Sequence, residues 1–139
     1  NLNLKAVWSG AQAASKIMKE RGSGTIINIS SILTHTAAPS NGPYTLAKTA
    51  VENFTQTLAA ELAEFGIRVN AVAPGPIPTE VFVKFFEVAE KDLPELAVNL
   101  GIPLGRLGDP QDIAPAIAYL ASDASSWMTG KTITIAGGL

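Results

Sequence analysis

The feature that most constrains the fold of this chain is a regular alternation of amphipathic helical segments with short β-branched runs. Apolar residues recur at helical spacing in the segments 2–21, 44–65 and 110–121. Runs typical of buried strands lie at 25–29, 67–73 and 131–135. Strands that alternate with helices form a parallel sheet wound by right-handed crossovers. The sequence therefore predicts an α/β fold with a parallel sheet.

Local signals mark the ends of these elements. Gly22-Ser23-Gly24 stops the first helix, Gly66 ends the second, and Asp109-Pro110 supplies the N-cap and first residue of the third. The segment 81–100 is predicted to form one or two short helices interrupted at Pro94. Because the chain shows no internal repeat, linker or low-complexity tract, we expect residues 1–139 to belong to one domain.

The composition argues against several kinds of partner and site. Twelve acidic and ten basic residues give a net charge of −2, so neither nucleic acid nor an anionic membrane is expected as a partner. With no cysteine and one histidine, the chain cannot form disulfides, thiolate metal sites or a histidine-based zinc site, and no metal is expected. No apolar run approaches the roughly 20 residues of a membrane span. Residues 1–5 lack the features of a signal peptide. A cytoplasmic location is the expectation.

The strand ends predict where a ligand would bind. In an open parallel sheet, ligands bind beyond the carboxyl ends of the strands. Three loops are expected at that edge: the loop that begins with Ser30 and Ser31, the turn Pro74-Gly75-Pro76, and the pair Gly137-Gly138.

Tyr44 and Lys48 stand four residues apart at the start of the second helix and therefore share one of its faces. A free tyrosine has a pKa of about 10 and is a poor base at neutral pH, but a nearby cation stabilises the phenolate and lowers that pKa. Such a tyrosine can protonate a carbonyl oxygen while hydride reaches the carbon, and a serine hydroxyl can hydrogen-bond the same oxygen. The spacing alone is weak evidence, because solvated helix faces carry the same pair.

The surrounding sequence is more specific. The stretch Ile26-Ile27-Asn28-Ile29-Ser30-Ser31 precedes Tyr44-x-x-x-Lys48, and the stretches 66–75 and 105–130 follow. In this order they resemble the short-chain dehydrogenase/reductase family over essentially the whole chain. The resemblance implies the C-terminal half of a doubly wound, Rossmann-like parallel-sheet domain. It also implies an oxidoreductase that uses NAD or NADP to interconvert a carbonyl and an alcohol.

The resemblance implies roles for individual residues. Ser31 matches the catalytic serine, and Tyr44 matches the general acid/base. Lys48 matches the lysine that lowers the tyrosine pKa and holds the nicotinamide ribose. Asn3 matches an asparagine that supports an active-site water; the alternative is a residue that merely begins the helix. Tyr44 and Lys48 also contact the cofactor in this scheme, together with the loop residues Pro74, Gly75, Ile77 and Thr79.

The chain departs from the family pattern in three places. The glycine-rich turn T-G-x-x-x-G-x-G, which holds the pyrophosphate at a helix N-terminus, does not occur in it. We therefore expect the natural sequence to begin earlier and this chain alone to lack a complete cofactor site. Thr34 stands where many relatives have glycine, and Ala136 replaces an aspartate. We expect Thr34 and His35 to shape the substrate pocket, the alternative for His35 being a surface residue of the loop.

The sequence leaves the function between two classes. The first is the oxidoreductase described above, and the second is a truncated, non-catalytic fragment or association scaffold of the same fold. An epimerase of nucleotide sugars shares Y-x-x-x-K, but the stretch 105–130 fits it poorly.

The sequence gives less direct predictions for the substrate and the oligomeric state. The segment 81–100 falls where the family has its variable substrate lid, and its apolar character favours a neutral or apolar carbonyl compound. The resemblance also implies a homodimer or homotetramer built partly from the two long helices. Small residues on those helices permit close contact: Ala11, Ala14, Ala47, Ala50, Ala59 and Ala60.

Overall fold

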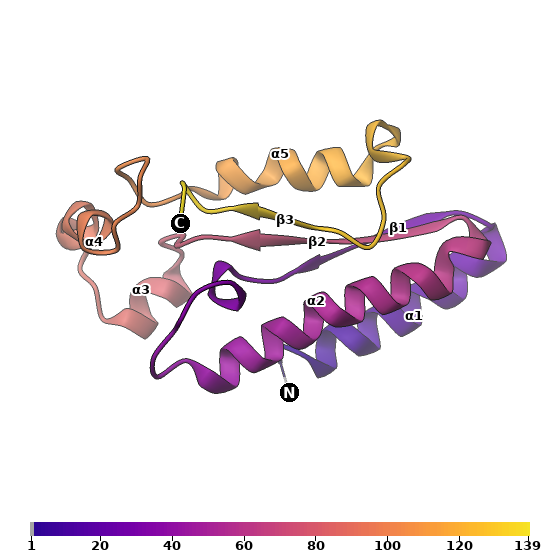
Figure 1. The fold of residues 1–139 in the computed structure, drawn as a ribbon, viewed down its shortest axis with the longest axis horizontal. Helices are drawn as coiled ribbons and strands as arrows, with labels where there is room; N and C mark the ends of the chain where they lie inside the picture. The colour runs from indigo at the N-terminus through magenta and orange to yellow at the C-terminus, as the bar shows by residue number, and fades with distance from the viewer. Residues whose placement is uncertain (1) are drawn as a thin grey trace.

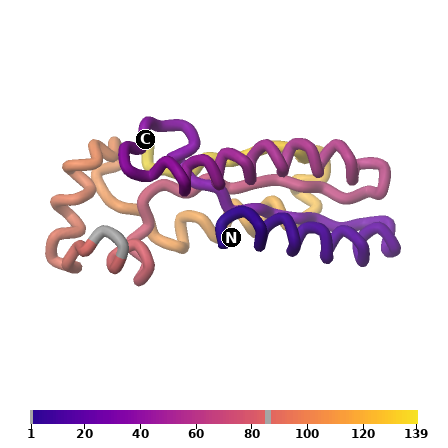
Figure 2. Tube along the Cα trace, turned by 90° about the horizontal axis from the view of Figure 1, so that it is seen from below, coloured from indigo at the N-terminus to yellow at the C-terminus, as the bar shows by residue number. Residues whose placement is uncertain are grey.

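The computed structural model describes residues 2–139, apart from the side chains of Phe85 and Phe86. Its centre is a parallel sheet in the order β1 (Gly24–Ile29), β2 (Ile67–Pro74) and β3 (Thr132–Ile135). Helices α1 (Lys5–Arg21) and α2 (Gly42–Leu62) lie side by side on one face of the sheet, and α5 (Pro110–Ala121) covers the other (Figures 1 and 2). The parallel α/β fold is confirmed.

The predicted helix ends are confirmed where glycine or a cap determines them. Gly22 follows α1 with φ of 67°, a left-handed conformation that glycine adopts without strain. Helix α2 continues as a 3-10 turn, Ala63–Phe65, to Gly66. Two features require glycine at position 66. Its φ is 69°, and a Cβ would stand 2.7 Å from the carbonyl oxygen of Gly22. At α5, Asp109 caps the first turn and Pro110 begins the helix.

Other boundaries differ from the sequence-based expectation. Helix α1 begins at Lys5 instead of residue 2, and α2 begins at Gly42 instead of Tyr44. The segment 81–100 forms α3 (Glu80–Phe86) and α4 (Leu93–Asn99), with a 3-10 turn over Glu90–Asp92. The predicted interruption at Pro94 is wrong, because Pro94 lies in the first turn of α4. Proline fits there since the first N–H groups of a helix have no partner within the helix.

The sheet separates two cores. One lies between the sheet, α1 and α2, and the other lies between the sheet and α5. Strand β2 runs through the middle and is almost wholly buried. Ala11 and Ala59 belong to the first core, so they pack within this chain and do not line an outer helix face. This removes two of the six alanines predicted to support helix contacts between subunits.

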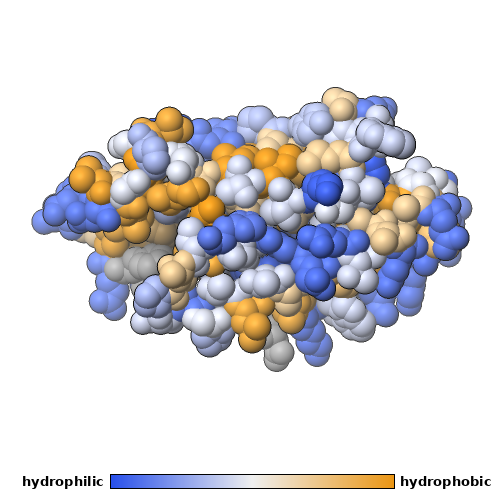
Figure 3. Space-filling view, viewed as in Figure 1, coloured by the Kyte–Doolittle hydropathy of each residue, from blue (hydrophilic) through white to orange (hydrophobic). Residues whose placement is uncertain are grey.

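Part of the surface near α4 and the C-terminus is apolar. Figure 3 shows hydrophobic residues on that side of the molecule, with hydrophilic residues at its outermost tip. The exposed large hydrophobic residues of these segments are Val98, Leu100, Leu104 and Leu139. Within residues 2–139, no helix combines the length and the apolar character that crossing a membrane requires.

Candidate active site

The register of the sheet brings two candidate loops together. Ile29 pairs with Val72 at the end of β1, and Pro74 pairs with Ile135 at the end of β3. Because the strands are parallel, the loops that follow β1 and β2 leave the sheet at the same edge. The structure thus places the loop of Ser30 and Ser31 next to the one that begins at Pro74.

Helix α2 presents Tyr44 and Lys48 toward this edge. Both side chains are half-buried, and the Lys48 ammonium lies 5.7 Å from the centre of the Tyr44 ring. Lys48 Nζ donates a hydrogen bond to the carbonyl oxygen of Ile29 at 2.9 Å, which ties the helix to the end of β1. Burial lowers the pKa of Lys48, because the ammonium loses part of its hydration. The arrangement holds a partly desolvated cation close to a tyrosine.

Ser31 is buried and begins a 3-10 turn, Ile32–Thr34. Its hydroxyl oxygen accepts a hydrogen bond from the backbone N–H of Leu33 at 3.3 Å. A hydroxyl carries one proton and two acceptor positions, so this bond leaves the proton for another acceptor. Among the described residues, neither the Ser31 proton nor the Tyr44 hydroxyl takes part in a hydrogen bond. Both groups are therefore suited to bind the oxygen of a substrate.

Asn3 lies in the turn before α1, not within the helix as predicted. It is half-buried and lines a hollow between α1 and β1 that Lys48 and Ile29 also border. The structure thus gathers Asn3 and Lys48 around one space, although they belong to different helical segments of the sequence.

The loop after β2 is anchored on its far side. The N–H of Gly75 donates to the carbonyl oxygen of Ile135 at 2.8 Å, and the N–H of Gly108 donates to that of Pro76 at 3.0 Å. A side chain at Gly75 would stand 2.7 Å from the Cα of Ala136, so glycine is required for this close approach. Ile77 packs its side chain into the core beside α5.

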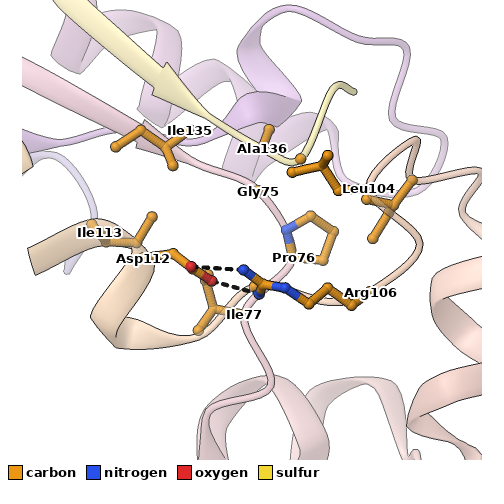
Figure 4. Close-up of a pocket in the computed structure, with 12 residues that line it drawn as sticks. Gly75, Pro76, Ile77, Leu104, Arg106, Asp112, Ile113, Ile135 and Ala136 are labelled. Carbon is orange, nitrogen blue, oxygen red and sulfur yellow. Dashed lines mark hydrogen bonds and ion pairs between the residues drawn. The ribbon is translucent and has the colours of Figure 1, made fainter.

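A pocket of about 160 Å³ lies behind this loop (Figure 4). Its wall combines the loop after β2, the start of α5 and the end of β3. Arg106 and Asp112 face each other there in a two-pronged ion pair, with N–O distances of 2.7 and 2.8 Å. The guanidinium beside it lowers the pKa of Asp112 to about 2. The sequence analysis did not predict this pair, although Arg106 and Asp112 lie on either side of the predicted helix start at Asp109-Pro110.

The sequence analysis also missed Glu52. Its side chain is 14% exposed, and its Oε1 accepts hydrogen bonds from Ser30 Oγ at 2.6 Å and Thr34 Oγ1 at 2.8 Å. His35 Nε2 lies 3.5 Å from the same oxygen. Glu52 stands four residues after Lys48, so helical spacing could have placed it on the face of α2 that carries Tyr44 and Lys48. His35 is thus directed to a carboxylate, and Thr34 fastens the loop to α2.

Taken together, these elements define an open parallel α/β protein with polar side chains at the carboxyl edge of its sheet. In the described part of the chain, no cluster of three or more potential metal-ligating residues occurs there or elsewhere. Residues 1–139 match the family described as enoyl-(acyl carrier protein) reductase. The chain belongs to the short-chain dehydrogenase/reductase family.

Individual relatives agree with this family. The chain is 45% identical over 137 residues to a 3α-hydroxysteroid dehydrogenase of Mediterraneibacter gnavus, covering 99% of this chain and 53% of the relative. It is 43% identical over 139 residues to a 3-oxoacyl-(acyl-carrier-protein) reductase of Thermotoga maritima, covering 100% and 54%. A gluconate 5-dehydrogenase from Burkholderia cenocepacia, solved with NADP and tartrate, superposes with a TM-score of 0.89 at 36% identity, covering 99% and 52%. The chain therefore spans about half the length of the relatives it matches.

Proposed function

We propose that this chain carries the catalytic residues of an NAD(P)-dependent oxidoreductase that interconverts a carbonyl and an alcohol by hydride transfer. The observation that carries the proposal is the placement of Tyr44 and Lys48 on one face of α2, with Lys48 bonded to the end of the strand that leads to Ser31. Among the described residues, neither the Tyr44 hydroxyl nor the Ser31 proton has a hydrogen-bond partner, and a partly desolvated cation lies close to Tyr44. These features suit proton transfer to a substrate oxygen better than they suit a purely structural role.

In this proposal each residue has a separate role in the reaction of one carbonyl group. The Tyr44 hydroxyl gives its proton to that oxygen as hydride reaches the carbon, and it takes the proton back in the oxidation direction. The Ser31 hydroxyl donates a hydrogen bond to the same oxygen and orients it. The Lys48 ammonium stabilises the phenolate that Tyr44 becomes, and Asn3 supports a water molecule near Lys48.

The dinucleotide supplies the hydride, and the chain's own residues fit its nicotinamide end. Lys48 provides a hydrogen-bond donor for a ribose hydroxyl, and Tyr44 lies beside it. The loop after β2 leaves the sheet at the same edge and would line the nicotinamide through Pro74, Gly75, Ile77 and Thr79. The NADP in the superposed gluconate 5-dehydrogenase supports this assignment of the cofactor class. The sequence holds no feature that selects NAD over NADP.

The substrate is proposed to be a small neutral or apolar carbonyl or alcohol compound. The relatives are named for different compounds: a hydroxysteroid, an oxoacyl group on an acyl carrier protein, and gluconate. Exposed apolar residues at the α4 end, such as Val98 and Leu100, would offer an apolar entrance. We further propose a homodimer or homotetramer in the cytoplasm, with α1 and α2 at a subunit interface.

Replacing Tyr44 with phenylalanine tests the proposed function. In the protein at its natural length, Tyr44→Phe should lower turnover by about 10²- to 10⁴-fold, because the ring stays and the proton donor is lost. Turnover is measured with NAD(H) and NADP(H) on a hydroxysteroid, gluconate and an oxoacyl thioester. Tyr119→Phe, on the exposed surface of α5, is the matched control and should keep the wild-type rate. More than half the wild-type rate in Tyr44→Phe would contradict the assignment.

A further inference from the structure

One carboxylate oxygen, Glu52 Oε1, contacts three polar side chains of the loop after β1. Glu52 Oε1 accepts from the hydroxyls of Ser30 and Thr34, at 2.6 and 2.8 Å, and lies 3.5 Å from His35 Nε2. The Glu52 side chain is 14% exposed and that of His35 is 47% exposed, so the carboxylate lies beneath the loop and the imidazole at its outer edge. Hydrogen bonds to an ionised carboxylate are about twice as strong as neutral ones. Glu52 therefore anchors this loop firmly to α2.

The two hydroxyl donors bracket Ser31. Ser30 directly precedes it, and Thr34 closes the 3-10 turn that Ser31 begins. The N–H of Thr34 donates to the Ser31 carbonyl oxygen at 3.1 Å, and Thr34 Oγ1 lies 2.8 Å from that oxygen as well. The one proton of the Thr34 hydroxyl is shared between this oxygen and Glu52 Oε1. Glu52 thus bonds to residues on both sides of Ser31.

Glu52 lies on the same helix, α2, as the proposed catalytic residues Tyr44 and Lys48. Glu52 follows Lys48 by one turn and Tyr44 by two, so α2 carries all three on one face. A displacement of about 1 Å at a reacting group can cost on the order of 10²-fold in rate. Resting on the proposed function, we infer that Glu52 is a positioning residue. It sets the distance between the Ser31 hydroxyl and Tyr44 by clamping the turn, and it does not touch the substrate.

Kinetics on variants of the protein at its natural length test this inference. Glu52→Ala should lower kcat on the order of 10- to 100-fold with little change in the KM for the dinucleotide. Glu52→Gln keeps an oxygen that both hydroxyls can donate to, so it should recover most of the lost rate. Thr34→Val, which keeps the shape of threonine but loses the hydroxyl, should lower kcat less than Glu52→Ala does. Glu61→Gln, an exposed carboxylate on the same helix, is the matched control and should leave kcat unchanged.

A double-mutant cycle distinguishes positioning from a general structural role. If Glu52 acts through Ser31, adding Glu52→Ala to Ser31→Ala should lower kcat by less than twofold further. Hydrogen exchange at the amides of Leu33 and Thr34, which donate to Ser31, should quicken in Glu52→Ala while the amides of β2 keep their protection. If Glu52→Ala does not fold, Thr34→Val replaces it in the double-mutant cycle with Ser31→Ala.

The outcomes separate this inference from the proposed function. If Ser31→Ala turns over at the wild-type rate, the proposed function is wrong and the inference fails with it. If Ser31→Ala is impaired but Glu52→Ala and Thr34→Val are not, only the inference is overturned. It is also overturned if Glu52→Ala lowers kcat by the same factor with and without Ser31, because the carboxylate would then act on the fold at large.

Discussion

At the residue scale, Lys48 is placed where it costs stability. Its ammonium is partly buried, and folding lowers its pKa below 10.5. The folded state therefore binds the proton less tightly than the unfolded chain does. The burial cost is fully present below the lowered pKa and disappears as the pH rises through that value toward 10.5. The hydrogen bond from the ammonium to the Ile29 carbonyl oxygen holds the charge beside Tyr44. A residue kept at such a cost is suited to a functional role.

Lys48→Met should weaken both turnover and the binding of the cofactor. Without the cation, alcohol oxidation should slow on the order of 10²-fold, because the phenolate that Tyr44 becomes in the proposed step loses its stabilising charge. The dissociation constant of the dinucleotide should also increase. Initial rates and fluorescence titration measure the two effects, with Lys16→Met on the exposed face of α1 as control. A wild-type rate in Lys48→Met would show that another group stabilises the phenolate.

At the element scale, the start of α5 is held by a compact set of charged groups. The side chain of Asp109 accepts from the N–H of Gln111, and that of Asp112 accepts from the N–H of Asp109, each at 2.8 Å. Arg106, in the turn that precedes α5, donates two hydrogen bonds to the carboxylate of Asp112. Between them, Gly108 bonds to the carbonyl oxygen of Pro76, so the same turn supports the candidate cofactor loop. The charged pair thus links the beginning of α5 to the carboxyl edge of the sheet.

Arg106→Ala should raise the pKa of Asp112 from about 2 toward, but not up to, its ordinary value of 3.8. The N–H of Asp109 would still donate to the carboxylate and keep part of the shift. Because folding lowers this pKa, the contribution to stability is present above pH 3.8 and is lost as the pH falls toward about 2. The pair is partly exposed to solvent, so this contribution is small. Carboxyl-carbon NMR titration reports the pKa, and Arg21→Ala, at the far end of α1, should leave it unchanged. No shift in Arg106→Ala would refute the pairing in solution.

At the scale of the whole molecule, β1 pairs only with β2 among the described strands. Its other edge pairs with no described strand, and Ile29 at the end of β1 is 41% exposed. An open strand edge with apolar neighbours favours pairing with another chain.

The 139-residue chain on its own should bind NAD and NADP more weakly than micromolar. Pyrophosphate binding in this kind of fold needs a glycine-rich turn before a helix N-terminus, and the sequence contains no T-G-x-x-x-G-x-G. Only the nicotinamide end would be contacted, through Lys48 and the loop after β2. Calorimetric titration of the chain beside the protein at its natural length provides the comparison. Micromolar binding by the chain alone would show that the glycine-rich turn is dispensable.

The sequence by itself determined what depends on neighbours within one or two turns of chain. Alternating periodicity specified the helices, the strands and their parallel order, and the shared face of Tyr44 and Lys48 follows from helical spacing alone. Glycine and Asp-Pro signals located three helix ends because they act on the local backbone. The break near Pro94 was misplaced because proline is compatible with both the end and the start of a helix.

Only the tertiary structure decided which distant polar groups meet. Glu52 joins Ser30 and Thr34 across 22 and 18 residues, and Asn3 borders the same hollow as Lys48. No periodicity specifies such contacts, since they depend on the path of a loop and on how closely α2 packs against the end of β1. The helix spacing therefore placed Tyr44 and Lys48 on one face, whereas the carboxylate that accepts from Ser30 and Thr34 became visible only in the folded loop.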